Sequence, residues 1–268
     1  MGEIFSHLFM QKAVFAGLAS ALVCSILSVY VVLKRMAFIG EGISHSAFGG
    51  VALAILLGWN ITITTIAFAG GVAVLIGVFC RDRRISEDSA IGILLTTSMA
   101  LGVVFLNIHR EFTADIFGYL FGNILAIETA NLVAIGILTV VVITVVAIFY
   151  KELFFFSFDE EMARTSGEPT GFLHFLLLLL ISLTVVVFIK VVGLILVSAL
   201  LIIPGAAALL VSRSFSRMMI VAVILGVVSA LASLFASYYL HLSTGACMVL
   251  CLFLVFLVFR MIPGFRRS

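Results

Sequence analysis

Nine apolar runs, each long enough to cross a lipid bilayer, constrain this chain more than any other feature of its sequence. A membrane-spanning helix needs about 20 mostly apolar residues, and a helix satisfies its backbone hydrogen bonds internally, as lipid requires. The sequence therefore predicts an all-α fold, a polytopic membrane helix bundle of about nine transmembrane helices in one domain over residues 1–268. The predicted spans are 13–33, 37–58, 60–80, 89–106, 129–150, 171–190, 192–212, 217–240 and 245–260.

Composition excludes several classes of protein. Apolar residues make up 64% of the chain and charged residues only 10%, whereas soluble domains carry about 45–50% and 25%, so a water-soluble monomer is excluded. The net charge of +2 is too small and too dispersed to indicate nucleic acid as a partner. No predicted loop is long enough for a separate catalytic domain.

The basic residues predict the orientation of the bundle. Lys and Arg are enriched in cytoplasmic loops, and twelve of the fifteen fall on one side if the N-terminus lies outside. Only Lys12, Arg110 and Lys190 fall on the other side. We therefore expect a multi-pass membrane protein with its N-terminus outside and its C-terminus in the cytoplasm.

Three local features modify the plain bundle. Gly49 and Gly50, like Gly70, Gly71 and Gly77, are expected to let neighbouring helices approach closely. Pro204-Gly205 lies in the middle of the seventh span and is expected to break or kink it. Residues 107–128 mix apolar and polar side chains, and part of this stretch is a candidate re-entrant or interfacial helix.

An acid and a histidine lie at or near the start of the second span, where ionisable groups are costly. Glu41 and His45 are four residues apart, so on a helix they face the same way and can converge on one ion. Ser44 could add a hydroxyl. A carboxylate at the bilayer centre costs about 2.5–3.5 kcal/mol and is rarely kept without a partner. These residues are therefore candidate metal ligands on a translocation path.

Two structural interpretations of the same pair remain open. A Glu41–His45 hydrogen bond can join two helices, or the pair can lie at a helix end in contact with cytoplasmic water. One carboxylate and one imidazole also make an incomplete metal site, since zinc takes about four ligands and manganese about six. The remaining ligands would come from backbone, water or another helix.

A second group of charges follows the fourth span on the side assigned to the exterior. It contains His109, Arg110, Glu111 and Asp115. These residues are candidates for docking an extracytoplasmic partner, and the alternative is that they are ordinary solvated loop charges.

The longest cytoplasmic loop contains the pattern of a short helix over residues 157–167. Ser157 and Glu160 have the spacing of a capping box, and Asp159, Glu160 and Glu161 place negative charge in the first turn. Gly167 is a natural C-cap, followed by Pro169. The plain interpretation is an interfacial connector anchored by phenylalanines.

Several motifs together resemble those of the bacterial zinc, manganese and iron ABC transporter permeases. Glu161-Met162-Ala163 followed by Gly167 is similar to the EAA-type loop with which ABC importer permeases engage their ATPase. The other matching segments lie at 34–36, 40–45 (GEGISH), 50–54, 87–92 (EDSAIG), 119–122 (YLFG), 192–194 and 200–206. The resemblance covers about residues 12–262.

This resemblance implies a permease subunit of an ABC importer that moves zinc, manganese or iron into a bacterium across its inner or plasma membrane. Its implied partners are a cytoplasmic ABC ATPase, an extracytoplasmic metal-binding protein, membrane lipid and a second permease subunit, expected to be a copy of itself. It also implies roles in metal passage for Glu41 and His45, and in ATPase coupling for Asp159, Glu160, Glu161, Ala163 and Gly167. Glu41 stands where the family usually has Asp, and Gly49 where many members have Pro, so metal preference does not transfer directly.

Other function classes make different demands on the sequence. The chain contains no G-x-x-x-x-G-K-[ST] motif, so we expect a transport subunit that is not an enzyme, with ATP used by the partner and no cofactor bound permanently. A secondary transporter using Glu41 for ion or proton coupling remains the alternative, although it favours internal repeats with paired broken helices. An intramembrane metalloprotease would favour H-E-x-x-H, which is absent. Acid and imidazole ligands suit zinc, manganese and iron alike.

Overall fold

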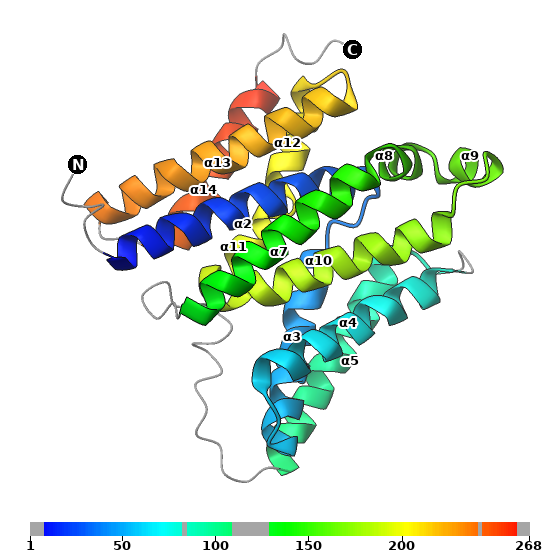
Figure 1. The fold of residues 1–268 in the computed structure, drawn as a ribbon, viewed down its shortest axis with the longest axis vertical. Coiled ribbons are helices and arrows are strands. Elements are labelled where there is room, and N and C mark those ends of the chain that lie inside the picture. Colours follow the sequence, from blue (N-terminus) through cyan, green and yellow to red (C-terminus); the bar gives the residue numbers. More distant parts are fainter. Residues whose placement is uncertain (1–7, 82–84, 109–128, 241–242, 262–268) are drawn as a thin grey trace.

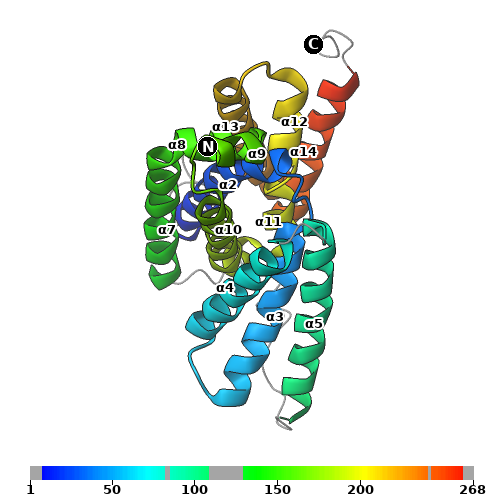
Figure 2. The same cartoon turned by 90° about the vertical axis from the view of Figure 1, so that its right-hand side faces the viewer.

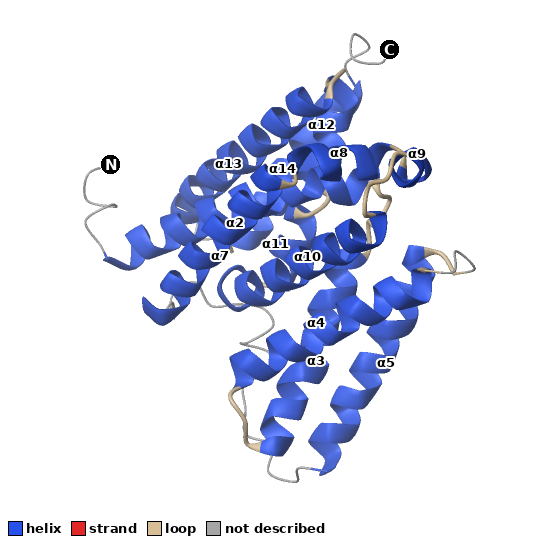
Figure 3. Ribbon diagram, turned by 45° about the vertical axis from the view of Figure 1, so that its right-hand side comes forward, coloured by secondary structure: helices blue, strands red, loops and turns tan. Residues whose placement is uncertain are grey.

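The computed structural model describes residues 8–81, 85–108, 129–240 and 243–261, and within these ranges every regular element is a helix. Figure 3 shows this all-helical architecture. In chain order the helices are α2 (Leu8–Leu33), α3 (Ile39–Leu57), α4 (Ile61–Cys80), α5 (Glu87–Ile108), α7 (Thr129–Ile148), α8 (Tyr150–Phe158), α9 (Glu160–Thr165), α10 (Thr170–Val192), α11 (Leu194–Leu200), α12 (Ile203–Val211), α13 (Phe215–Leu240) and α14 (Thr244–Met261).

The nine predicted spans are confirmed in the described part of the chain. Nine stretches are long and apolar enough to cross a membrane, and their bounds differ from the predicted ones by a few residues. The seventh of them, Leu194–Val211, is made of α11 and α12 together. The chain is therefore a polytopic membrane helix bundle.

Two groups of helices make up the bundle, and α10 lies between them (Figure 1). Helices α3, α4 and α5 pack on one another, while α2, α12, α13 and α14 form the second group. Helix α10 contacts α4 and α3 on one side and α2 and α7 on the other. Figure 2, turned by 90°, shows the same separation of α3, α4 and α5 from the rest. The start of α3 lies where the two groups meet, because Gly40 approaches Ser198 of α11, and α11 packs on α14 and α2 of the second group.

Some of the predicted small-residue contacts form and others do not. A Cβ on Gly49 would lie 2.7 Å from the Ser98 carbonyl oxygen, and one on Gly50 would lie 2.9 Å from the Thr65 Cα, so α3 touches α5 and α4 almost backbone to backbone. Gly77 is equally crowded by Phe175. Gly70 and Gly71, in contrast, have no other heavy atom within 4 Å of an added Cβ. Glycine content in a span thus marks a close contact only where the fold brings a neighbour to that face.

The seventh span is broken where its proline predicts. Helix α11 ends at Leu200, α12 begins at Ile203, and Pro204 occupies the first turn of α12, where a missing N–H costs no helical hydrogen bond. Gly193, with φ of 90°, separates α10 from α11. Broken helices at membrane depth persist only inside protein or beside a cavity, and residues on both sides of the break are buried.

The loops assigned to the cytoplasm meet on one side of the bundle. The loop after α2 contacts α9 through Lys34 and Glu160. Tyr150 of α8 lies 2.9 Å from Ser216 at the start of α13, hydroxyl to hydroxyl. The rings of Phe154 and Phe215 are 4.9 Å apart. These contacts agree with the alternation of loops that nine spans require.

Candidate functional site

Glu41 and His45 form a pair on one face of α3. Glu41 is the third residue of the helix, and its Oε1 lies 3.1 Å from the Nε2 of His45, one turn further on. The side chain of Glu41 is 44% exposed and that of His45 is 29% exposed. With metal–ligand bonds of about 2.1 Å, two ligands at roughly a right angle are about 3 Å apart, so the observed separation suits two donors to one ion.

The pair lies inside the span and beside the broken helix. Its neighbour Gly40 approaches the α11–α12 break so closely that a Cβ would lie 3.1 Å from Leu201 Cδ1 and 3.4 Å from Ser198 Cα. Ser198 and Leu201 belong to the seventh span, Leu194–Val211. The first turn of α3, which carries Glu41, therefore packs against the α11–α12 break.

Ser44 does not join the pair. It is fully buried, and its Oγ has no hydrogen-bond partner among the described residues. The structure thus brings together two of the three candidate metal ligands, Glu41 and His45, and turns the third towards the packed interior of the bundle.

One interpretation of the pair can now be discarded. The Glu41–His45 contact lies within α3, so it does not join two helices. The pair also stays incomplete within one chain, because the described residues contain no group of three His, Cys, Asp or Glu side chains able to hold a metal ion. Its exposed sides leave room for donors from outside the chain.

The short helix of the long loop forms, but its N-cap lies two residues later than the capping box predicts. Helix α8 continues through Ser157, whose Oγ donates to the Leu153 carbonyl at 2.6 Å. The N-cap of α9 is Asp159, whose Oδ1 accepts from the Met162 N–H at 2.9 Å. The prediction of Ser157 as the cap was wrong because a preceding helix already used its hydroxyl.

The other end of α9 confirms the predicted glycine C-cap. Gly167 has a φ of 90°, and its N–H donates to the Arg164 carbonyl at 3.2 Å. The next N–H, of Glu168, reaches back to the Ala163 carbonyl at 3.0 Å, which completes a Schellman motif. α9 is thus a defined six-residue helix, Glu160–Thr165.

Helix α9 has distinct inner and outer faces. Ala163 is fully buried against the bundle, while Met162 is 58% exposed. Glu160 points inward to Lys34, and Glu161 and Arg164 are exposed. The candidate coupling residues therefore divide into a group that attaches the helix and a group that faces outward.

The candidate docking residues His109, Arg110, Glu111 and Asp115 lie outside the described residues, as does the candidate re-entrant stretch from 109 onwards.

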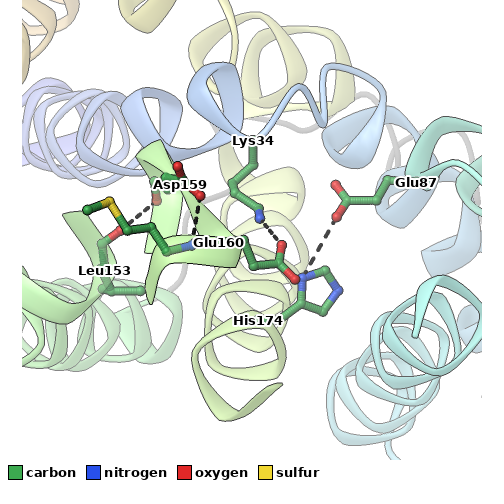
Figure 4. A network of polar contacts seen from close by, with 8 residues as sticks. Lys34, Glu87, Leu153, Asp159, Glu160 and His174 are labelled. Carbon is green, nitrogen blue, oxygen red and sulfur yellow. Dashed lines mark hydrogen bonds and ion pairs between the residues drawn. The ribbon is translucent and has the colours of Figure 1, made fainter. Parts of the chain in front are cut away.

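Four polar residues from distant parts of the chain meet beneath α9, and sequence reasoning did not find this cluster. Lys34 Nζ lies 2.6 Å from Glu160 Oε2, and His174 Nδ1 lies 3.8 Å from Glu87 Oε1 (Figure 4). Glu87, Glu160 and His174 line a cavity of about 480 Å³ between α4, α5, α9 and α10. Lys34 and Glu160 are 126 residues apart, and no spacing rule connects them.

Comparison with known proteins gives consistent matches along nearly the whole chain. Residues 6–262 match the family described as "ABC 3 transport family". The manganese transport system membrane protein MntC of Listeria monocytogenes is 36% identical over 255 residues, which cover 95% of this chain and 91% of that protein. The chelated iron transport system membrane protein YfeD of Yersinia pestis is 35% identical over 260 residues, covering 96% and 86%.

A solved structure also matches the fold. The structure described as "PsaBC from Streptococcus pneumoniae in complex with Fab" contains a chain that superposes with a TM-score of 0.83 at 31% sequence identity. The match covers 97% of the present chain and 93% of that chain.

Proposed function

Because the chain belongs to the ABC 3 transport family, we propose that it is the permease subunit of an ABC importer that carries a divalent transition metal into the cytoplasm. The names of its relatives, which specify manganese and iron, support a metal cargo. The permease itself is proposed to hydrolyse nothing, with ATP used by a separate ATPase subunit. This family membership favours the ABC mechanism over an ion-coupled secondary transporter.

The observation that carries the proposal is the Glu41–His45 pair. It offers one carboxylate oxygen and one imidazole nitrogen at 3.1 Å, a donor set that suits manganese, iron and zinc. Two donors bind an ion weakly, which suits a transient site that must release its cargo. We propose that a second permease subunit, a copy of this chain, brings a second pair to complete the site.

The broken seventh span suggests how access to the pair changes. The α11–α12 break lies against Gly40, next to Glu41. The helical hydrogen bonds are already interrupted between α11 and α12. The two helices can therefore pivot relative to each other without breaking the hydrogen bonds within either one. We propose that movement at this break exposes the pair alternately to the two sides of the membrane.

Helix α9 is the proposed ATPase docking element. Its outer face presents Glu161 and Met162, which combine an apolar anchor with a negative charge. Its inner face is held by Ala163 and by the Lys34–Glu160 ion pair. A rigid helix attached in this way transmits a push from a cytoplasmic subunit better than a loop does.

Replacing Gly167 with proline is expected to detach the ATPase. Proline holds φ near −65°, whereas Gly167 has φ of 90° and donates its N–H to the Arg164 carbonyl, so the C-cap of α9 cannot form. The permease should still insert in the membrane, and co-purification of the ATPase should fall by at least about tenfold. Gly167→Asn, which tolerates a left-handed backbone, is the matched control and should retain the ATPase. Undiminished co-purification with Gly167→Pro would contradict the docking role.

The remaining proposals concern the exterior and the membrane. An extracytoplasmic metal-binding protein is proposed to dock at the loop carrying His109, Arg110, Glu111 and Asp115. The chain is proposed to lie in a bacterial inner or plasma membrane with its N-terminus outside and its C-terminus in the cytoplasm, surrounded by lipid.

The complete transporter, reconstituted in proteoliposomes with its ATPase and binding protein, tests the function directly. We expect ATP hydrolysis to rise when the binding protein is loaded with Mn²⁺, Fe²⁺ or Zn²⁺, and the same ion to accumulate inside the vesicles in the import direction. Comparing the three ions in parallel identifies the cargo. If none of the three ions raises the rate of ATP hydrolysis and none accumulates in the vesicles, the proposal is refuted.

A further inference from the structure

Lys34 lies in the connection between α2 and α3, and its side chain contacts the two short helices α8 and α9 of the long cytoplasmic loop. Its side chain is only 9% exposed, and its Nζ pairs with Glu160 Oε2 at 2.6 Å. The same ammonium lies 3.9 Å from the centroid of the Phe156 ring on α8, a distance at which a cation is attracted by the ring face. Lys34 is thus held by α8 and α9 together.

The segment that follows Lys34 leads directly to the candidate metal ligands. Lys34 N–H donates to the Tyr30 carbonyl at 2.9 Å, and Met36 N–H donates to the Val31 carbonyl at 3.0 Å, so the connection is fastened to the end of α2. Ile39 N–H then donates to the Met36 carbonyl at 3.0 Å, and both side chains are fully buried. Met36 and Ile39 are buried in this connection, whereas Arg35, Ala37 and Phe38 are exposed. The hydrogen bonds to the end of α2 and to the start of α3 are therefore what carries a displacement from Lys34 towards Glu41.

The surroundings of Glu160 leave room for such a displacement. Glu160 lines the cavity of about 480 Å³ that Glu87 and His174 also line, and Figure 4 shows these three side chains close together. One oxygen of the Glu87 carboxylate and the Nε2 of His174 are buried there without a hydrogen-bond partner among the described residues. A polar cavity beside a charged contact lets Glu160 shift without being forced into apolar packing.

We propose that Lys34 is a positioning residue that transmits the movement of α9 to the Glu41–His45 pair through its ion pair with Glu160. This inference rests on the proposed transport function. A contact that carries coupling free energy between two sites changes their linkage when it is removed. Loss of the Lys34–Glu160 contact is therefore expected to uncouple ATP hydrolysis from metal import in the complexes that contain the ATPase.

The test measures metal imported per ATP hydrolysed in the reconstituted complete transporter. Glu160→Gln and Lys34→Gln should each lower this ratio by at least about fivefold, measured on complexes purified with equal amounts of bound ATPase. Lys34→Arg keeps the charge and the contact with the Phe156 ring, and it should retain the ratio. Because the two residues act as one unit, the double variant Lys34→Gln/Glu160→Gln should be no worse than either single variant. Lys151→Gln, at an exposed lysine of α8, is the matched control.

The outcomes separate this inference from the proposed function. If the unaltered transporter imports metal and the two Gln variants keep its ratio, the role of Lys34 is refuted and the function stands. Additive losses in the double variant would also refute it, since they mean that the residues act independently. If the Lys34→Gln protein fails to fold, Glu160→Gln decides. The carboxylate of Glu160 is partly exposed, so its replacement has little structural cost. An unaltered transporter that imports no metal refutes the function itself.

Discussion

Glu41→Ala and His45→Ala are each expected to abolish metal import by the reconstituted transporter, with a loss of more than about 100-fold. Removing even a group that only supports a metal ligand typically costs about 10- to 100-fold, and each substitution here removes half of the donor pair. The fold should survive, because the contact lies within α3 and between partly exposed side chains, where an ion pair contributes about 0–1 kcal/mol. Uptake of the cargo ion and the amount of protein in the membrane are measured together.

A conservative variant distinguishes ligation from packing. Glu41→Asp keeps the carboxylate on a shorter side chain and is expected to retain measurable import, with its preference among Mn²⁺, Fe²⁺ and Zn²⁺ shifted because the oxygen moves relative to the His45 ring. Ser44→Ala serves as a second comparison, since the Ser44 hydroxyl is buried away from the pair and its loss should leave import nearly unchanged. Normal import by both alanine variants of the pair would remove the proposed site.

Gly205→Ala is expected to destabilise the fold strongly, although it adds only one methyl group. The added Cβ would overlap the backbone carbonyl of Ser28 on α2, and a backbone cannot move aside as a side chain can. Overpacking a close contact costs about 1–3 kcal/mol, which exceeds the gain of about 1 kcal/mol from the higher helix propensity of alanine. The thermal unfolding temperature in detergent should fall, and import should fall with it, because α12 borders the break beside Gly40.

The matched control for this substitution is Gly71→Ala. Gly71 also lies in a helix interior, but among the described residues no atom beyond its own stretch of helix comes within 4 Å of an added Cβ. Alanine there should leave the unfolding temperature unchanged or raise it slightly. Equal unfolding temperatures for the Gly205 and Gly71 variants would show that α2 and α12 do not approach as closely as the structure describes.

Features encoded by neighbouring residues were predicted well. The nine spans follow from run length and hydropathy, because each helix must satisfy its own backbone within the membrane. The Pro204 break and the Gly167 C-cap follow from backbone geometry that only those residues alter or permit. The Glu41–His45 contact follows from helical periodicity alone.

Features that depend on which helix or residue packs against a position were predicted poorly. Ser157 has a capping pattern, but α8 extends through it, and its hydroxyl bonds backwards to Leu153 instead. Ser44 lies one position from the ligand face and is turned inward. Gly70 and Gly77 look alike in sequence, yet only Gly77 meets another helix.

The sequence by itself determined the nine membrane-spanning helices of the described residues, where the seventh of them breaks, and that an acid and an imidazole share one face of the second. Each of these depends on interactions within a few residues along the chain. Only the tertiary structure decided that Lys34 meets Glu160 across 126 residues, and that both lie beside Glu87 and His174. Lipid exerts no hydrophobic preference among apolar helix faces, so the pairing of helices is decided by the packing of the whole bundle. That pairing connects α9 to the start of α3.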